Sequence, residues 1–235
     1  MLRIALIGAE STGKSQLAQA LAERLRRDTG LRCAMVPEHL RHWCEQQGRT
    51  PRAEEQAAIA AEQARQIEAA AATHDLVICD TTPLMTAIYS QLLFRDDSLL
   101  PAALDFQRSC ELTLLTALDL PWVADGLQRD GPQVQQPVDA ALRRALMGAG
   151  LGWSSVGGQG EARLESALNA ITPLLLRRGL LRSGRGQGLF TRLQARQDAL
   201  PEQAWFCQNC DVPECEHASL RQRAARLASS DPDPR

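Results

Sequence analysis

Lysine is almost absent from this 235-residue chain. Lys14 is the single lysine among 26 basic residues, and the other 25 are arginine. A genomic bias toward arginine can account for the 25, but it leaves Lys14 as an exception. Lysine carries a compact ammonium, whereas arginine carries a planar fork of donors. We therefore expect Lys14 to stand where only a compact positive charge fits.

Long apolar runs and a strong net charge are also missing. No segment reaches the roughly 18 apolar residues that a spanning helix needs, and the chain leads into the strand-like residues 2–7 without a secretory signal. The formal net charge of -2 gives no general reason to expect nucleic acid or an anionic membrane as partner. These absences predict a cytoplasmic protein without a membrane partner.

The first 180 residues alternate apolar strand-like runs with helical patterns. This rhythm is typical of a parallel sheet covered by helices, so we expect a three-layer α/β domain over residues 1–181. The polar residues 125–137, with two glycines and two prolines, indicate a mobile loop, and we expect a lid at about 125–147. The five expected parallel strands are residues 2–7, 31–36, 76–79, 112–118 and 152–156.

A phosphate-binding pattern, Gly8-x4-Gly13-Lys14-Ser15, follows the first strand and opens a helix. Pattern and context together favour a Walker A loop over a glycine turn that binds nothing. Backbone N–H groups and the helix N-terminus would hold phosphates, Lys14 would reach the β and γ phosphates, and Ser15 would meet Mg²⁺. We expect ATP and Mg²⁺ as ligands, although GTP stays open, and the expected contacts are Gly8, Glu10, Ser11, Thr12, Gly13, Lys14, Ser15 and Gln16.

Two carboxylates follow predicted strands at the same edge of the sheet. Asp80 ends an apolar strand, which is typical of a Walker B carboxylate for Mg²⁺, and a helix cap at Thr82 is the alternative. Glu38 and Arg41 lie one helical turn apart after the second strand. Glu38 could accept the proton of an attacking hydroxyl and Arg41 could hold developing charge. An exposed ion pair is the alternative for Glu38 and Arg41.

Four blocks in order resemble the nicotinamide riboside kinase domain of bacterial bifunctional NAD-biosynthesis regulators, within the NadR-like P-loop ATPase and kinase family. The blocks are residues 8–15, 36–41, 79–84 and 119–129, and the resemblance covers about residues 1–180. It implies a nucleoside-kinase-like fold. It also implies transfer of the γ-phosphate of ATP to the ribosyl 5′-hydroxyl of a pyridine nucleoside.

The resemblance also implies roles for individual residues. It makes Glu38 and Asp80 candidates for proton acceptance and metal positioning, and Thr81 falls within the third block. Asp125 and Arg129 fall at the start of the lid, where Arg129 could close onto the phosphates or remain a solvated loop charge. Trp122 could stack on a planar base or cap the core. Residues 154–163 resemble the turn that borders adenine in nucleoside and nucleotide kinases.

The chain also departs from the family pattern. Where the family usually has aromatic residues around the motif arginine, this chain has His39 and His42-Trp43, so the acceptor can differ from nicotinamide riboside. Nothing matching an adenylyltransferase domain or a helix-turn-helix precedes the P-loop. We expect no adenylyltransferase activity.

Residues 182–235 have a different texture, with a basic glycine-rich link, a cysteine cluster and a frayed tail. The cluster Cys207-x2-Cys210-x4-Cys215-x-His217 supplies four ligands for a closed, structural Zn²⁺ knuckle over residues 207–217. Redox-active thiols or unrelated buried residues are the alternatives. Nine arginines flank the cluster, but the near-neutral chain makes nucleic acid an unlikely partner.

The predicted function is ATP-dependent phosphorylation of a small-molecule nucleoside, and a homodimer is a candidate assembly. A different class stays open, in which the P-loop is a nucleotide-dependent regulatory module and the knuckle recognises a protein or nucleic acid. The two differ in a measurable way, because a kinase requires an acceptor whereas a regulatory ATPase shows slow hydrolysis alone.

Overall fold

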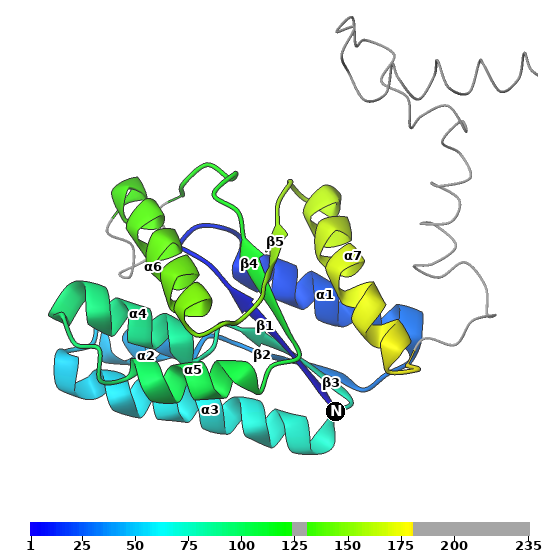
Figure 1. Cartoon of the computed structure of the whole chain (residues 1–235), viewed down its shortest axis with the longest axis horizontal. Helices are drawn as coiled ribbons and strands as arrows, with labels where there is room; N and C mark the ends of the chain where they lie inside the picture. Colours follow the sequence, from blue (N-terminus) through cyan, green and yellow to red (C-terminus); the bar gives the residue numbers. More distant parts are fainter. Residues whose placement is uncertain (124–130, 181–235) are drawn as a thin grey trace, which may run out of the picture. The chain divides into compact units, whose positions relative to one another are not determined.

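A computed structural model describes residues 1–123 and 131–180 of the chain, which belong to one compact unit. In this part of the chain, five parallel strands form one sheet in the order β2-β3-β1-β4-β5 (Figure 1). The predicted parallel five-stranded sheet is confirmed. The strands are β1 (Leu2–Ile7), β2 (Cys33–Val36), β3 (Leu76–Asp80), β4 (Leu112–Thr116) and β5 (Ser154–Val156).

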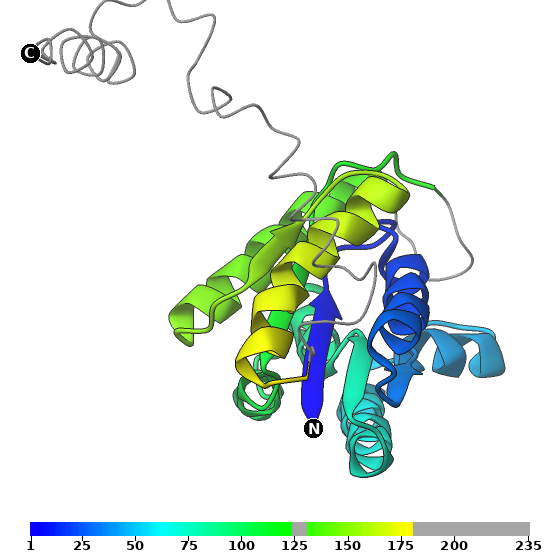
Figure 2. The same cartoon turned by 90° about the vertical axis from the view of Figure 1, so that its right-hand side faces the viewer.

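Helices cover both faces of the sheet and complete three layers. Helices α1 and α7 pack on one face, and α3 packs on the other face beside α4, which contacts α5 and α6. Figure 2 shows β1 rising from the N-terminus toward the edge where the loop to α1 lies. The helices are α1 (Lys14–Thr29), α2 (His39–Gln47), α3 (Gln56–Thr73), α4 (Pro83–Phe94), α5 (Leu100–Arg108), α6 (Gln135–Gly148) and α7 (Glu161–Arg177).

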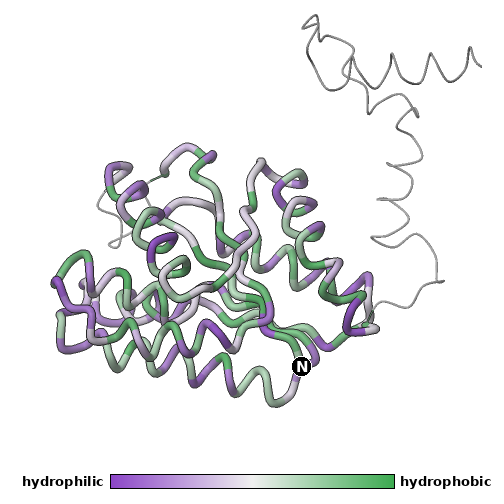
Figure 3. Tube along the Cα trace, viewed as in Figure 1, coloured by the Kyte–Doolittle hydropathy of each residue, from purple (hydrophilic) through white to green (hydrophobic). Residues whose placement is uncertain are grey.

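The core explains why the central strands carry almost no polar side chains. All five residues of β3 and five of the six of β1 are buried, because helices cover both faces of a parallel sheet. The strands accordingly run green through the centre of Figure 3. One apolar cluster joins β1 and β4 to α4, α5 and α6, and another joins β2 and β3 to α3. The C-terminal edge of β1 and β3 is thereby held rigidly.

Most of the segment in which a lid was predicted, residues 125–147, is helical. Residues Gln135–Gly148 form helix α6, and its Val138, Leu142 and Leu146 are buried against α4 in the core. Three apolar residues spaced four apart build a helical stripe, and their burial outweighs the glutamines and prolines that precede them. The expected loop over residues 125–137 therefore overlaps the helix only at residues 135–137, and the lid stays a prediction. Residues 124–130 lie outside the described residues.

The strand bounds differ slightly from those expected. β2 begins at Cys33, β4 ends at Thr116, β5 begins at Ser154, and β3 includes Asp80. Pairing with β1 sets the end of β3, since Leu6 is opposite Asp80 in the register. The position of Asp80 is thus fixed by the sheet itself and not by a loop.

None of the described helices is long and apolar enough to cross a membrane.

Candidate active site

The loop between β1 and α1 has a backbone that few residues can adopt. Gly8 has a φ of +150°, and a Cβ atom there would lie 2.0 Å from the Thr116 Oγ1 atom of β4. Gly13 has a φ of +74° and immediately precedes α1. Glycine tolerates both conformations because it has no Cβ. Steric requirements alone therefore account for glycine at both motif positions.

Side chains from distant parts of the chain hold this loop in place. Thr12 Oγ1 lies 2.7 Å from the Thr116 hydroxyl, and Gln135 Nε2 donates to the Glu10 carbonyl over 2.8 Å. The Ser11 hydroxyl accepts from the Val123 N–H over 2.8 Å. The loop is thus fixed by β4, by the start of α6 and by residues after β4. Such prior ordering reduces the entropy lost when phosphates bind.

Arg163 fixes the same loop from behind. Its guanidinium donates to the Thr12 carbonyl over 2.9 Å and to the Ala117 carbonyl over 3.1 Å. It also pairs with Asp119 Oδ1 at 2.6 Å, while the Gly158 N–H donates to the other oxygen of that carboxylate. Arg163 is only 4% exposed. This buried arginine ties the phosphate loop to the turn after β5, a role that the sequence did not reveal.

Lys14 is buried among three carboxylates. Its Nζ donates to the Ala9 carbonyl over 2.8 Å. Lys14 as a whole is 9% exposed. Burial lowers the pKa of Lys14, and the carboxylates of Glu38, Asp80 and Glu10 partly oppose that shift. An incoming polyanion would restore the charged form, since opposite charge favours ionisation. The single lysine therefore stands where a compact cation is electrostatically useful.

Asp80 and Ser15 fit the expected magnesium site. The Ser15 hydroxyl is hydrogen-bonded to the Asp80 carboxylate, and burial is the main reason that the pKa of Asp80 is raised. Oδ1 of Asp80 is buried and has no hydrogen-bond partner among the described residues. Hydroxyl and carboxylate oxygens suit Mg²⁺, which usually takes one or two carboxylates together with phosphates and waters. The orphaned oxygen favours the metal role over the helix cap.

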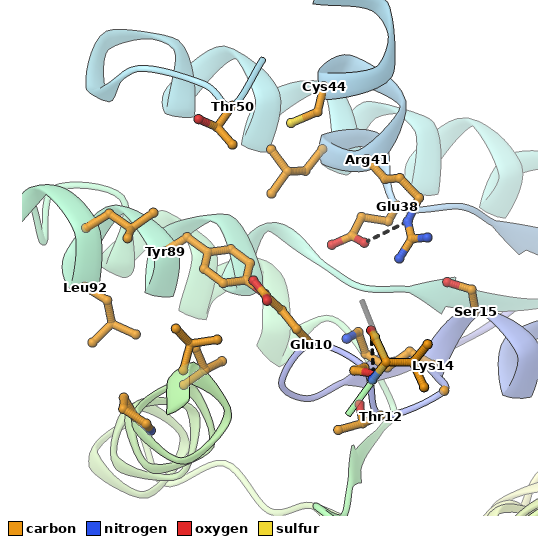
Figure 4. Close-up of a pocket in the computed structure, with 18 of the residues that line it drawn as sticks. Glu10, Thr12, Lys14, Ser15, Glu38, Arg41, Cys44, Thr50, Tyr89 and Leu92 are labelled. Atoms are coloured by element: carbon orange, nitrogen blue, oxygen red, sulfur yellow. Dashed lines mark hydrogen bonds and ion pairs between the residues drawn. The ribbon is translucent and has the colours of Figure 1, made fainter. Parts of the chain in front are cut away.

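Glu38 and Arg41 reach the loop from the start of α2. Arg41 Nε lies 3.8 Å from Glu38 Oε2, and the Glu38 side chain is only 10% exposed while that of Arg41 is 38% exposed. Figure 4 shows the two side chains pointing from α2 toward Lys14 and the loop. A nearly buried glutamate does not match the alternative of an exposed ion pair. Glu38 therefore lies in the same part of the molecule as the phosphate loop.

Gln63 of α3 holds the backbone on both sides of Glu38. Its Oε1 accepts from the His39 N–H over 2.6 Å, and its Nε2 donates to the Pro37 carbonyl over 3.2 Å. Gln63 is 2% exposed. A single buried amide thus satisfies one donor and one acceptor that flank the candidate base. No residue of this helix stands out in the sequence, so this positioning residue was missed.

One cavity of about 1470 Å³ connects the phosphate loop with a second region between α2, α3 and α4. Tyr89 of α4 points toward Glu10 at the boundary of the two regions (Figure 4). The sequence analysis did not identify this second region, since it is built from helices with ordinary amphipathic patterns. The walls of this second region include Leu40, Cys44, Thr50, Pro51, Gln56, Tyr89 and Leu92.

Most of the predicted site residues come together around the cavity. Its walls include Glu10, Ser11, Thr12, Gly13, Lys14, Ser15, Gln16, Glu38 and Arg41. Gly8 and Asp80 are not among the lining residues, although Gly8 belongs to the same loop and the Asp80 carboxylate is hydrogen-bonded to Ser15. Thr81 is buried, has a φ of +71°, and donates its N–H to the Leu6 carbonyl.

Other predicted site residues do not join the cavity. Trp122 is absent from its described walls, and its buried Nε1 has no hydrogen-bond partner among the described residues. Asp125 and Arg129 lie outside the described residues, as do the predicted zinc ligands Cys207, Cys210, Cys215 and His217. Across residues 1–123 and 131–180, no group of three or more histidine, cysteine or acidic side chains forms a further metal site. The zinc knuckle stays a prediction.

Comparisons with known proteins identify a family and a fold. A family model described as an AAA domain matches residues 3–163 of the chain. Two solved structures of NadR protein are similar in fold: one in complex with NR has a TM-score of 0.60 at 18% identity, and one in complex with NAD and AMP-PNP has 0.59 at 17% identity. Each covers 79% of this chain, which in turn spans about half of those chains, 53% and 51%. No curated protein matches the sequence.

Proposed function

Because the chain belongs to the AAA-domain family, with a complete P-loop, we propose that it is an ATP-dependent small-molecule kinase. We propose nicotinamide riboside or a related nucleoside as the acceptor and the ribosyl 5′-hydroxyl as the attacking group. One observation carries the proposal. The buried carboxylate of Glu38 faces the same cavity as Lys14, and that cavity continues into a second region with room for an acceptor.

The phosphate side of the cavity would bind ATP through this chain's own groups. Lys14 and the N–H groups at the start of α1 would neutralise and orient the phosphates. Ser15 and Asp80 would hold Mg²⁺, which when bound neutralises charge on the phosphate oxygens. Phosphoryl transfer requires mostly positioning and electrostatic stabilisation from the protein. The pre-ordered loop provides both.

The acceptor side would supply the proton transfer. The acceptor oxygen forms a bond to the γ-phosphorus, the bond between that phosphorus and the bridging oxygen of ADP breaks, and the hydroxyl proton passes to Glu38. Arg41, held near Glu38, would stabilise negative charge on the transferred group, and Arg129 is a second candidate for this role. Gln63 would hold the backbone on both sides of Glu38 in position during the step.

The test is coupled ADP release by the full chain with Mg-ATP, with and without nicotinamide riboside and a panel of other nucleosides. We expect one nucleoside to raise the rate well above basal hydrolysis and to gain a phosphate by mass. ATP binding with a flat response across the panel would contradict the kinase and would favour a nucleotide-dependent regulatory module.

A further inference from the structure

The turn between β3 and α4 contains a threonine in a conformation that threonine rarely adopts. Thr81 has a φ of +71°, in the left-handed region that disfavours side chains branched at Cβ. It is buried and follows Asp80 directly. Strained residues of this kind persist only where the surrounding structure holds them, and they cluster at functional sites. The strain at Thr81 therefore indicates that neighbouring contacts hold this turn in place.

A glutamine of α5 anchors the turn through Thr82. The Thr82 hydroxyl donates to Gln107 Oε1 over 2.7 Å, and Gln107 Nε2 donates to the Thr113 hydroxyl of β4 over 2.8 Å. All three side chains belong to buried residues. On the other side of the turn, the Thr81 N–H donates to the Leu6 carbonyl of β1 over 3.0 Å. The turn is thus tied to β1 and, through Gln107, to β4, so it cannot relax without breaking buried hydrogen bonds.

Helix capping does not account for the contact between Thr82 and Gln107. Thr82 is the N-cap residue of α4, where a threonine oxygen normally accepts from a backbone N–H of the first helical turn. Among the described residues, the Thr82 side chain forms no such capping bond. Its hydroxyl is directed to Gln107 instead. The anchoring of the turn is therefore the role that the structure leaves for this hydroxyl.

The anchored turn begins at the candidate magnesium carboxylate. The sheet sets the place of Asp80 along β3, opposite Leu6, whereas the direction of its carboxylate also depends on the peptide that joins it to Thr81. Because α4 is packed in the core, a change of φ at Thr81 would have to be absorbed by that peptide. The carboxylate would then move relative to its partner Ser15. Mg²⁺ tolerates little error, since it demands near-ideal octahedral geometry.

We propose that Gln107 is a positioning residue that, through Thr82, keeps Thr81 in its left-handed conformation and thereby holds the Asp80 carboxylate in the geometry that Mg²⁺ requires. Neither Gln107 nor Thr82 is among the described residues of the cavity wall, so both act through Asp80 and not on the ligand. The inference rests on the proposed function, because it concerns the metal that would accompany ATP. Residues that orient a metal ligand from outside typically change metal affinity by about ten- to a hundredfold.

The experiment measures the affinity of the full chain for ATP by calorimetry, first with Mg²⁺ and then with EDTA in its place. We expect Thr82→Val and Gln107→Met each to reduce the gain in affinity from Mg²⁺ by about tenfold, while metal-free ATP binds within about threefold of the wild type. Thr82→Ser keeps the hydroxyl and should keep the gain. Thr172→Val is the matched control, because it removes a buried hydroxyl that donates to the Leu168 carbonyl within α7.

The gain from Mg²⁺ separates a positioning role from a purely structural one. A structural role would lower the urea midpoint of both variants and leave the gain unchanged, and that result would overturn the inference. A wild-type chain that binds ATP equally well with and without Mg²⁺ would overturn it too. If Gln107→Met does not fold, Thr82→Val, which changes shape least, decides the question. If the gain falls as expected but no nucleoside is phosphorylated, the kinase proposal fails and the role of Gln107 stands.

Discussion

The two regions of the cavity are built in different ways. On the phosphate side, backbone groups dominate, and Thr116, Gln135 and Arg163 hold the loop through hydrogen bonds from three distant elements. On the acceptor side, helices α2, α3 and α4 present apolar walls with a few polar groups, Glu38 and Gln56 among them. Phosphates are the same in every nucleotide, whereas acceptors differ. A fixed backbone cradle suits the first task, and a side-chain wall suits the second.

The largest effect should come from removing the compact cation on the phosphate side. Lys14→Met should lower phosphoryl transfer by about a thousandfold or more, since a preorganised charge at the phosphates is lost. The free energy of unfolding should change by only about 1 kcal/mol, because the substitution removes the desolvation cost of the ammonium together with its attraction to the nearby carboxylates. Single-turnover transfer and urea denaturation measure the two quantities.

Two further substitutions sharpen this result. Lys14→Arg should also impair transfer, since a planar guanidinium fits poorly where an ammonium is buried. Arg27→Met, on the exposed side of α1, should leave transfer unchanged. Transfer by Lys14→Met within tenfold of the wild type would contradict the assigned role.

On the acceptor side, Glu38→Gln should lower transfer by about a hundredfold to ten-thousandfold, the usual contribution of a general base. ATP affinity should change little, because the amide keeps the shape and the backbone contacts of Gln63 remain. Presteady-state transfer and titration with ATP measure the two effects separately. Glu68→Gln, exposed on α3, is the matched control. An unchanged transfer rate in Glu38→Gln would remove this residue from the mechanism.

Substitution of a residue that holds the phosphate side should also lower the free energy of unfolding more than substitution of a control arginine. Arg163→Met should lower the free energy of unfolding by about 3 kcal/mol, because Asp119 and the buried carbonyls of Thr12, Ala117 and Gly158 lose their donor. Urea denaturation of the apo protein measures it. Arg108→Met should cost less than about 1 kcal/mol, since its pair with Asp105 is exposed on α5. Equal losses in the two variants would show that Arg163 does not hold the loop.

The smallest expected effect is the pH dependence of stability that the Asp80 carboxyl contributes. Burial raises its pKa, so the neutral form is favoured by the folded state. The associated stability is fully present below the ordinary carboxyl pKa and is lost as pH rises through the raised pKa. Asp80→Asn should therefore be as stable as the wild type at pH 7, within about 1 kcal/mol.

The same variant should lose metal-dependent binding. Mg²⁺ needs the ionised carboxylate, so wild-type affinity for Mg-ATP should fall as pH drops through the raised pKa of Asp80. Asp80→Asn should bind Mg-ATP about ten- to a hundredfold more weakly and should lack this acid-side slope. Titrations at a series of pH values from neutral down to the ordinary carboxyl pKa check both statements. A variant with the wild-type slope would contradict the metal role of Asp80.

The contrast also explains what could be predicted from the sequence. The positions of the phosphate loop, Glu38 and Asp80 could be predicted because each lies at the C-terminal end of a strand, where local pattern determines the place at the sheet edge. Arg163 and Thr12 are 151 residues apart and Gln63 and His39 are 24 apart, so their contacts leave no local pattern. Gln56 and Tyr89 belong to helices whose periodicity reports only that one face is buried.

The start of helix α6 differs from the expectation, because the expected loop ran to residue 137 and the helix begins at Gln135. Its first residues, rich in glutamine and proline, suggested a loop, whereas the apolar stripe of Val138, Leu142 and Leu146 packs it into the core. Local composition dominated the prediction, and tertiary packing determined the structure. The strand ends were likewise misjudged by a few residues, since pairing with a neighbouring strand decides where each strand stops.

The most direct test of the central claim follows the γ-phosphate of labelled Mg-ATP in the presence of the full chain and nicotinamide riboside. The account predicts that the label appears on the nucleoside in a one-to-one ratio with ADP, and that Glu38→Gln removes this transfer. Label found only as inorganic phosphate, at the same rate with and without every nucleoside tested, would contradict a kinase.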